Sequence, residues 1–471
     1  MKKTRIAVSV VLVLVWGGIC LADVGPAPRS PQGEAGADPS KENAELKARI
    51  EKLEKELAEL KQMVTQQAET AKARPATTVS AKPADAEPNI VKPAAEKKPV
   101  LSGLDVELYG RLKLDAVFDT SRMDTGNYGK WVRPDRGNND HTQFDMTANE
   151  SRLGFRVFGP KGEDIQTGGR VEIDFYGGGA ENKSNPMIRH AYLTIDWPKD
   201  KFGILAGQTS DVISPLYPDT LNYTVGWWAG NIGYRRPQVR LTKSYALDKD
   251  VELKLEGALA RTIGRTNSSI LPAGDQTDSG ENAGIPGFQG RVSMTFPWLG
   301  YKPTTIGFSG HYAKEEYDTN SSGGVVTGSK RFDSWSLNLD VLQPVNEWLS
   351  FKGEFFTGEN LDAYLGGIGQ GVNTVRSKEI GSDGGWVEAS LGPWGKWSFN
   401  AGLSVDDADN SDITGMSGDK REYNRSIFGN VLYDIDKNAQ IGFELSQWHT
   451  KYQGAGDADS LRAQTSFIYK F

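Results

Sequence analysis

The final residues of the chain, Leu461–Phe471, constrain its fold most, because apolar and polar side chains alternate along them. Successive side chains of a β-strand point to opposite faces. One face carries Ala463, Thr465, Phe467, Tyr469 and Phe471. The other carries Arg462, Gln464, Ser466 and Lys470, with Ile468 as an exception. A long strand with an apolar and a polar face that ends on an aromatic residue is typical of a transmembrane β-barrel. The alternative is an amphipathic edge strand of a soluble sandwich.

The N-terminus predicts export. Lys2, Lys3 and Arg5 precede an apolar run that ends near Ala22, which is the pattern of a signal peptide over residues 1–22. Cys20 is the one cysteine, so we expect no disulfide in the mature chain. No later run of 18 apolar residues predicts a membrane helix.

The composition is compatible with a barrel around a wet lumen. Charged residues make up 24% of the chain, and the mean hydropathy is −0.49. Only every second residue of a barrel strand faces lipid, so such a protein has the composition of a soluble one. The net charge of −7 argues against a nucleic-acid partner.

Three segments precede the predicted barrel. Residues 23–39 are rich in Gly, Pro, Ala and Asp, and we expect them to be disordered. Residues 40–68 show a heptad pattern, which predicts a periplasmic coiled coil. Residues 69–102 form an Ala-, Pro- and Lys-rich linker.

The coiled coil contains a run similar to a known trimerisation motif of short coiled coils, Arg49-Ile50-Glu51-Lys52-Leu53-Glu54. The alternative is an ordinary solvated charge pair. We expect a trimer through six residues: Arg49, Ile50, Leu53, Glu54, Leu57 and Leu60.

Residues 103–471 predict an all-β transmembrane barrel of 16 antiparallel strands. The strands centre on 106–118, 152–158, 170–175, 189–197, 202–208, 238–244, 251–259, 289–296, 305–312, 334–342, 349–356, 386–391, 397–406, 425–435, 441–448 and 461–471. Short turns alternate with long, mostly polar loops such as 119–143, 262–286 and 359–384. An even strand count and this asymmetry place both termini on the short-turn, periplasmic side.

The third loop, residues 209–236, differs from the others because it is aromatic and apolar, which suits burial. We expect it to fold into the lumen, and the alternative is packing at a trimer interface. Arg235, Arg236 and Arg240 cluster where this loop meets the wall.

Two wall arginines extend this cluster in the prediction. Arg156 and Arg170, on nearby strands, form a cationic ladder with it, opposite Asp211 or Asp219. Arginine rings select anions and carboxylates, so the sequence predicts an anion-preferring constriction. The alternative is that Glu172 and Asp174 neutralise these arginines.

The order of several motifs, together with the coiled-coil prefix, resembles the DcaP-like porins. The motifs are Leu108-Tyr109-Gly110-Arg111-Leu112-Lys113-Leu114-Asp115, Ser151-Arg152-Leu153-Gly154-Phe155-Arg156, Arg189-His190-Ala191-Tyr192-Leu193-Thr194, Leu205-Ala206-Gly207-Gln208-Thr209 and Arg235-Arg236-Pro237-Gln238-Val239-Arg240. The resemblance implies a homotrimeric diffusion porin, with helices that trimerise in the periplasm and a preference for small anions such as dicarboxylates. It also implies that the third loop forms the constriction, with roles for Arg235, Arg236 and Arg240. The last strand resembles the closing strand of bacterial outer-membrane proteins, so we expect Phe467, Tyr469 and Phe471 to form the barrel assembly signal.

The predicted function is an outer-membrane porin for passive diffusion of small hydrophilic solutes. The alternatives are a substrate-specific sugar channel and a structural barrel tethered to the cell wall. Expected partners are further copies of the chain, outer-membrane lipids and lipopolysaccharide, the barrel assembly machinery, peptidoglycan and small anionic solutes. We expect no nucleic acid, no cofactor and no metal. The four histidines lie in no nucleophile motif, so we expect no enzyme.

Overall fold

The computed structural model describes residues 105–135, 141–160, 162, 164–178, 183–264, 278–322 and 325–471. The predicted signal peptide, disordered segment, coiled coil and linker, and with them the trimerisation residues from Arg49 to Leu60, lie outside the described residues.

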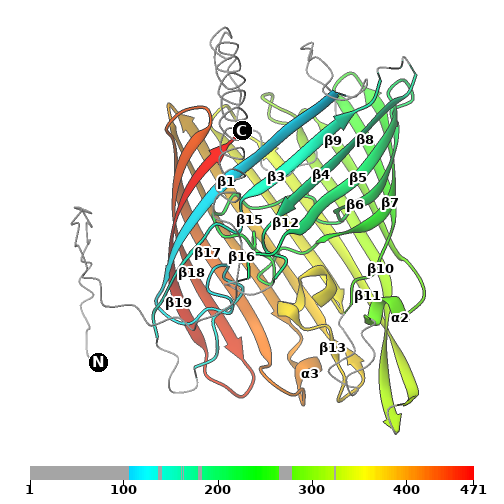
Figure 1. Cartoon of the computed structure of the whole chain (residues 1–471), viewed down its shortest axis with the longest axis vertical. Helices are drawn as coiled ribbons and strands as arrows, with labels where there is room; N and C mark the ends of the chain where they lie inside the picture. Colours follow the sequence, from blue (N-terminus) through cyan, green and yellow to red (C-terminus); the bar gives the residue numbers. More distant parts are fainter. Residues whose placement is uncertain are drawn as a thin grey trace, which may run out of the picture. The chain divides into compact units, whose positions relative to one another are not determined.

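The described chain forms a closed antiparallel β-barrel (Figure 1). Its strands are β1 (Asp105–Asp119), β2 (Gln143–Thr147), β3 (Arg152–Phe158), β4 (Gln166–Asp174), β5 (Met187–Trp197), β6 (Phe202–Ser210), β7 (Arg235–Asp248), β8 (Val251–Ala260), β9 (Gly287–Phe296), β10 (Thr304–Ser322), β11 (Val325–Pro344), β12 (Leu349–Glu359), β15 (Gly381–Trp394), β16 (Trp397–Ala408), β17 (Arg421–Asp434), β18 (Ala439–Tyr452) and β19 (Ala458–Lys470). β2 and β3 both pair with β1 and together make one crossing of the wall, so the seventeen strands make sixteen crossings. The barrel closes where β1 pairs with β19. The predicted sixteen-stranded barrel is confirmed.

The two faces of the wall follow the predicted alternation. On β1, Leu112 is 56% exposed, whereas its neighbour Lys113 is 4% exposed. On β19, Phe467 is exposed and Ser466 is buried. The outer face is therefore apolar and the inner face polar, as in membrane barrels. Within the described part of the chain, no helix is long and apolar enough to cross a membrane.

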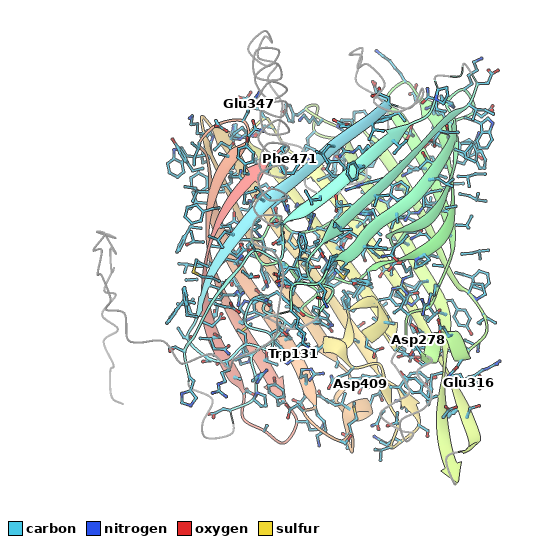
Figure 2. All side chains as sticks on the ribbon, in the orientation of Figure 1. Trp131, Asp278, Glu316, Glu347, Asp409 and Phe471 are labelled. Carbon is cyan, nitrogen blue, oxygen red and sulfur yellow. The ribbon has the colours of Figure 1, made fainter. Side chains whose placement is uncertain are left out.

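Short turns lie at one end of the barrel and long loops at the other. Figure 2 shows Glu347, in the turn between β11 and β12, and Phe471 toward one end. It shows Asp278, Glu316 and Asp409 toward the opposite end. The chain closes the barrel near its last residue, where Gly110 and Phe471 exchange two backbone hydrogen bonds of 3.0 and 3.1 Å.

The β10–β11 hairpin is longer than predicted, at 19 and 20 residues. Beyond Ala313, the charged residues Lys314, Glu315, Glu316 and Asp318 interrupt the apolar alternation, so the sequence pattern does not predict a strand there. Cross-strand ion pairs occur instead: Arg331 lies 2.6 Å from Glu316, and Lys314 lies 2.8 Å from Asp333. Figure 1 shows this hairpin extending beyond the other strands.

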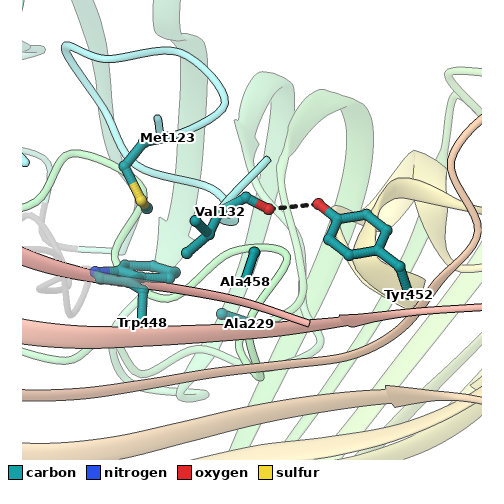
Figure 3. Close-up of a cluster of buried hydrophobic side chains, with 6 residues drawn as sticks. All are labelled: Met123, Val132, Ala229, Trp448, Tyr452 and Ala458. Atoms are coloured by element: carbon teal, nitrogen blue, oxygen red, sulfur yellow. Dashed lines mark hydrogen bonds between the residues drawn. The ribbon is translucent and has the colours of Figure 1, made fainter. Parts of the chain in front are cut away.

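Two loops expected to be polar contain buried apolar side chains. In the first loop, Met123 and Val132 pack with Ala229 of the third loop and with Trp448 of β18 (Figure 3). The loop between β12 and β15 buries Leu361, Tyr364, Ile368 and Ile380 completely, among other residues. Both segments are mostly polar as predicted, but their few apolar residues are buried, and no strand or helix period in the sequence indicates this burial.

The loops hold a few short elements. They are α2 (Ser279–Asn282), η2 (Asp362–Tyr364), η3 (Gly367–Gly369), β13 (Val372–Asn373), β14 (Lys378–Glu379) and α3 (Asn410–Ile413). The loop that carries η2 and η3 is called the sixth loop below, because it is the sixth of the long loops in chain order.

Candidate functional site, the lumen at the third loop

The third loop connects β6 to β7 and follows the inside of the barrel wall. Its contacts advance around the barrel in the order of the strands. In loop order, the partners are Gln289 on β9, Glu354 on β12, Glu388 on β15, Asn430 on β17, Glu444 on β18, Gln464 on β19, Lys113 on β1 and Asp174 on β4. The segment Asp211–Tyr223 therefore makes most of a circuit of the wall.

Wall carboxylates accept hydrogen bonds from backbone N–H groups of this loop. Leu216 N donates to Glu354 at 2.7 Å, and Asp219 N donates to Glu388 at 2.6 Å. Leu221 N donates to Glu444 at 2.7 Å. Each of these bonds satisfies a loop amide that is buried away from water.

Wall donors bind the loop carbonyls between these amides. Asn430 donates to Asp219 O at 2.7 Å. Gln464 and Lys113 both donate to Leu221 O, at 2.7 and 2.9 Å. A loop without secondary structure must satisfy its buried backbone groups by such bonds, because an unpaired buried amide is costly.

The second half of the loop packs against the first and sixth loops. Trp228 N donates to Leu365 O at 2.7 Å, and Gly233 N donates to Tyr364 O at 2.8 Å. Asn222 Nδ2 donates to Gly129 O of the first loop at 2.9 Å. Three loops thus meet inside the ring of strands.

Arg236 is buried in this junction. Its side chain has no exposed surface, and its Nε lies 2.7 Å from Asp211. Its guanidinium lies 3.8 Å from the centre of the Tyr364 ring and donates to Ala363 O at 3.0 Å. Burial raises the pKa of Tyr364 to about 12, so this phenol stays neutral and Asp211 supplies a countercharge.

Arg235, the adjacent residue, has a different environment. It is 4% exposed, and its guanidinium lies 5.4 Å from the Trp227 ring and 5.1 Å from the Tyr234 ring. Its Nε and Nη2 are buried and have no hydrogen-bond partner among the described residues. Arg240, on β7, donates to Gln238 and to the carbonyl of Ser210.

Arg156 and Arg170 lie together around Tyr109. Arg170 Nε donates to the Tyr109 hydroxyl at 2.6 Å, and Arg170 Nη2 lies 2.7 Å from Glu172. Arg156 lies 4.0 Å from the Tyr109 ring centre and 3.6 Å from Glu107.

The structure therefore distributes the predicted constriction residues over several places. Arg236 and Asp211 form one pair, whereas Asp219 pairs with Lys352 of β12 at 2.9 Å. Arg170 bonds Glu172, which is the neutralised arrangement considered as an alternative.

Arg189 and His190 face the lumen together, which alternation alone does not predict. The register of β4 and β5 shifts at Glu172, a β-bulge that turns two successive side chains to one face. Arg189 bonds Glu172 at 2.8 Å and Asp174 at 2.9 Å. His190 Nδ1 lies 2.9 Å from Thr209 Oγ1.

A cavity of about 650 Å³ lies against β5–β8, next to the start of the third loop. Charged side chains of both signs line it, among them Asp196, Arg240, Glu252 and Lys254. The lumen is thus mixed in charge on this side.

No protein-family model matches the chain, and no curated protein matches it. Solved structures do match. The outer membrane channel DcaP of Acinetobacter baumannii aligns at 19% identity with a TM-score of 0.62, over 80% of this chain and 100% of that one. This likeness confirms, at the level of the fold, the resemblance inferred from the sequence.

Two further structures align less well. The anion-selective porin from Comamonas acidovorans aligns at 13% identity with a TM-score of 0.48, over 78% of this chain and 100% of that one. OmpF of Salmonella typhi aligns at 14% identity with a TM-score of 0.49, over 78% of this chain and 98% of that one.

Proposed function

We propose that this protein is an outer-membrane porin through which small hydrophilic solutes diffuse, and that it prefers anions such as small dicarboxylates. The closed barrel, its apolar outer face and its polar inner face support a membrane channel. The fold shared with DcaP is consistent with this function.

The environment of Arg235 is the observation that supports the anion preference most strongly. Arg235 stands out among the third-loop arginines because two of its nitrogens are buried without an acceptor, whereas Arg236 is paired with Asp211. A buried guanidinium without a countercharge keeps its positive charge at the third loop, and that charge favours an anion in the opening. Arginine also fits the planar shape of a carboxylate.

The reversal potential under a salt gradient tests this preference. We expect an anion-signed potential for the wild type, and a shift toward zero for Arg235→Ala and for Arg240→Ala. Arg331→Ala is the matched control, because Arg331 lies on the outer hairpin and bonds Glu316. An unchanged potential in Arg235→Ala contradicts the role of Arg235.

The protein is proposed to be a homotrimer in the outer membrane, with residues 40–68 as a periplasmic coiled coil. Lipids and lipopolysaccharide contact the apolar wall in this proposal, and the assembly machinery reads Phe467, Tyr469 and Phe471.

Two other functions make different predictions. The current through a sugar channel is blocked by an oligosaccharide and does not change in Arg235→Ala. A barrel whose function is to tether peptidoglycan loses that function when residues 23–102 are deleted, whereas a porin keeps its conductance. The absence of enzymatic activity stays a prediction.

A further inference from the structure

We infer that Glu354, Glu388 and Glu444 are positioning residues that hold the third loop as a ring inside the wall. The inference rests on the porin function proposed above. The three carboxylates are 4%, 2% and 1% exposed, and each accepts a backbone N–H of the loop.

The dimensions of the loop and the wall explain why the anchors have long side chains. An extended chain rises about 3.3 Å per residue, so Asp211–Tyr223 spans roughly 40 Å. Sixteen strands about 4.8 Å apart give the wall a circumference of at least roughly 77 Å. The loop's path is therefore shorter than the wall's, and glutamate, glutamine and lysine side chains bridge the difference.

Glycines make room where the wall and the loop approach each other closely. A Cβ placed on Gly442 of β18 would lie 3.0 Å from both Cδ atoms of Leu221. The loop in turn has Gly230, whose φ of +118° favours glycine, where a Cβ would lie 2.3 Å from the carbonyl oxygen of Gly385.

Each anchor bonds the backbone of the loop, and Glu444 also accepts the Thr220 hydroxyl at 2.7 Å. The carboxyl groups thus fix where the loop backbone lies. The ring is held from β12 to β18 by hydrogen bonds on separate strands. Loss of one bond therefore loosens one arc of the ring and leaves the barrel closed.

Other charged groups face this row and contribute to its field. Lys352 lies 3.6 Å from Glu388 and 2.9 Å from Asp219. Lys113 binds Leu221 O beside Glu444. These lysines remain in place when one of the glutamates is replaced, so each variant also changes the local balance of charge.

Single-channel recordings of Glu388→Ala and Glu444→Ala test the inference. Each alanine leaves a buried loop N–H without its acceptor, which changes the population of the detached loop by about tenfold. We expect a larger mean conductance with added open-channel noise in each variant, and a greater effect in the double variant. Glu388→Gln and Glu444→Gln keep an acceptor oxygen, so we expect them to retain most of the wild-type conductance.

Asp340→Ala is the matched control. Asp340 is a wall carboxylate of similar burial, at 2% exposed, and it accepts two hydrogen bonds from Arg291. We expect its conductance and noise to match the wild type. If Glu388→Ala and Glu444→Ala conduct like this control, the loop is not held by these residues and the inference is overturned.

A second readout covers variants that conduct poorly for other reasons. Expressed without residues 1–22, the chain has no cysteine, so Leu221→Cys introduces a single thiol at a position that is 5% exposed. We expect slow modification by a water-soluble maleimide in the parent and at least tenfold faster modification with Glu444→Ala. Equal rates contradict the inference. A wild-type protein that folds but does not conduct contradicts the porin function itself, and so separates the two failures.

Discussion

The guanidinium of Arg236 lies over the ring of Tyr364, 3.8 Å from its centre, and neither side chain is exposed. This contact joins the end of the third loop to the sixth loop. Asp211, at the start of the third loop, completes it through its ion pair with Arg236. The two ends of the loop and a neighbouring loop thus share one buried charge pair.

Removing one partner of this pair is predicted to lower the stability of the protein more than removing both partners. Asp211→Ala leaves the Arg236 charge buried without its partner, which costs about 3–5 kcal/mol. We expect a lower midpoint of thermal unfolding, followed by circular dichroism. The double variant Asp211→Leu/Arg236→Met removes both charges, and we expect a midpoint closer to the wild type. Equal losses in the single and double variants contradict the buried pair.

Gly230 is predicted to be intolerant of a side chain. Alanine at its φ of +118° is strained by about 1–3 kcal/mol, and its Cβ would collide with the Gly385 carbonyl. We expect Gly230→Ala to displace the loop from β15 and to raise open-channel noise. Gly429→Ala is the control, because a Cβ there meets no atom within 4 Å. Currents in Gly230→Ala with the open-channel noise of the wild type would argue against the close contact between Gly230 and Gly385.

The heptad segment is predicted to trimerise by itself. A peptide of residues 40–68 is expected to sediment as a trimer, and Ile50→Asp is expected to sediment as a monomer, because an acid at a core position opposes knobs-into-holes packing. Glu51→Lys, outside the seam, serves as the control. A monomeric wild-type peptide assigns trimerisation to the barrel wall instead.

Much of the fold is predictable from the sequence because a membrane wall imposes strict alternation. Alternation alone puts Leu112 and Lys113 on opposite faces, and the structure places Leu112 outside and Lys113 inside. The sequence centres the two strands of the β10–β11 hairpin on 305–312 and 334–342, because charged residues such as Lys314 and Arg331 interrupt the apolar alternation beyond them.

The lumen was harder to predict for a different reason. The third loop stands out by its aromatic residues, but its path depends on which side chains across the barrel meet its backbone. Alternation along residues 441–448 puts Glu444 on the polar face, but nothing in the local sequence indicates that it accepts the amide of Leu221. The bulge that turns Arg189 and His190 to one face likewise leaves no local signal.

Conductance of the purified protein in a planar bilayer, with a salt gradient across it, is the most direct test of the porin function. We expect stepwise currents, in groups of three if the protein is a trimer, with an anion-signed reversal potential. A correctly folded protein that inserts without any current contradicts a diffusion porin and favours a structural barrel.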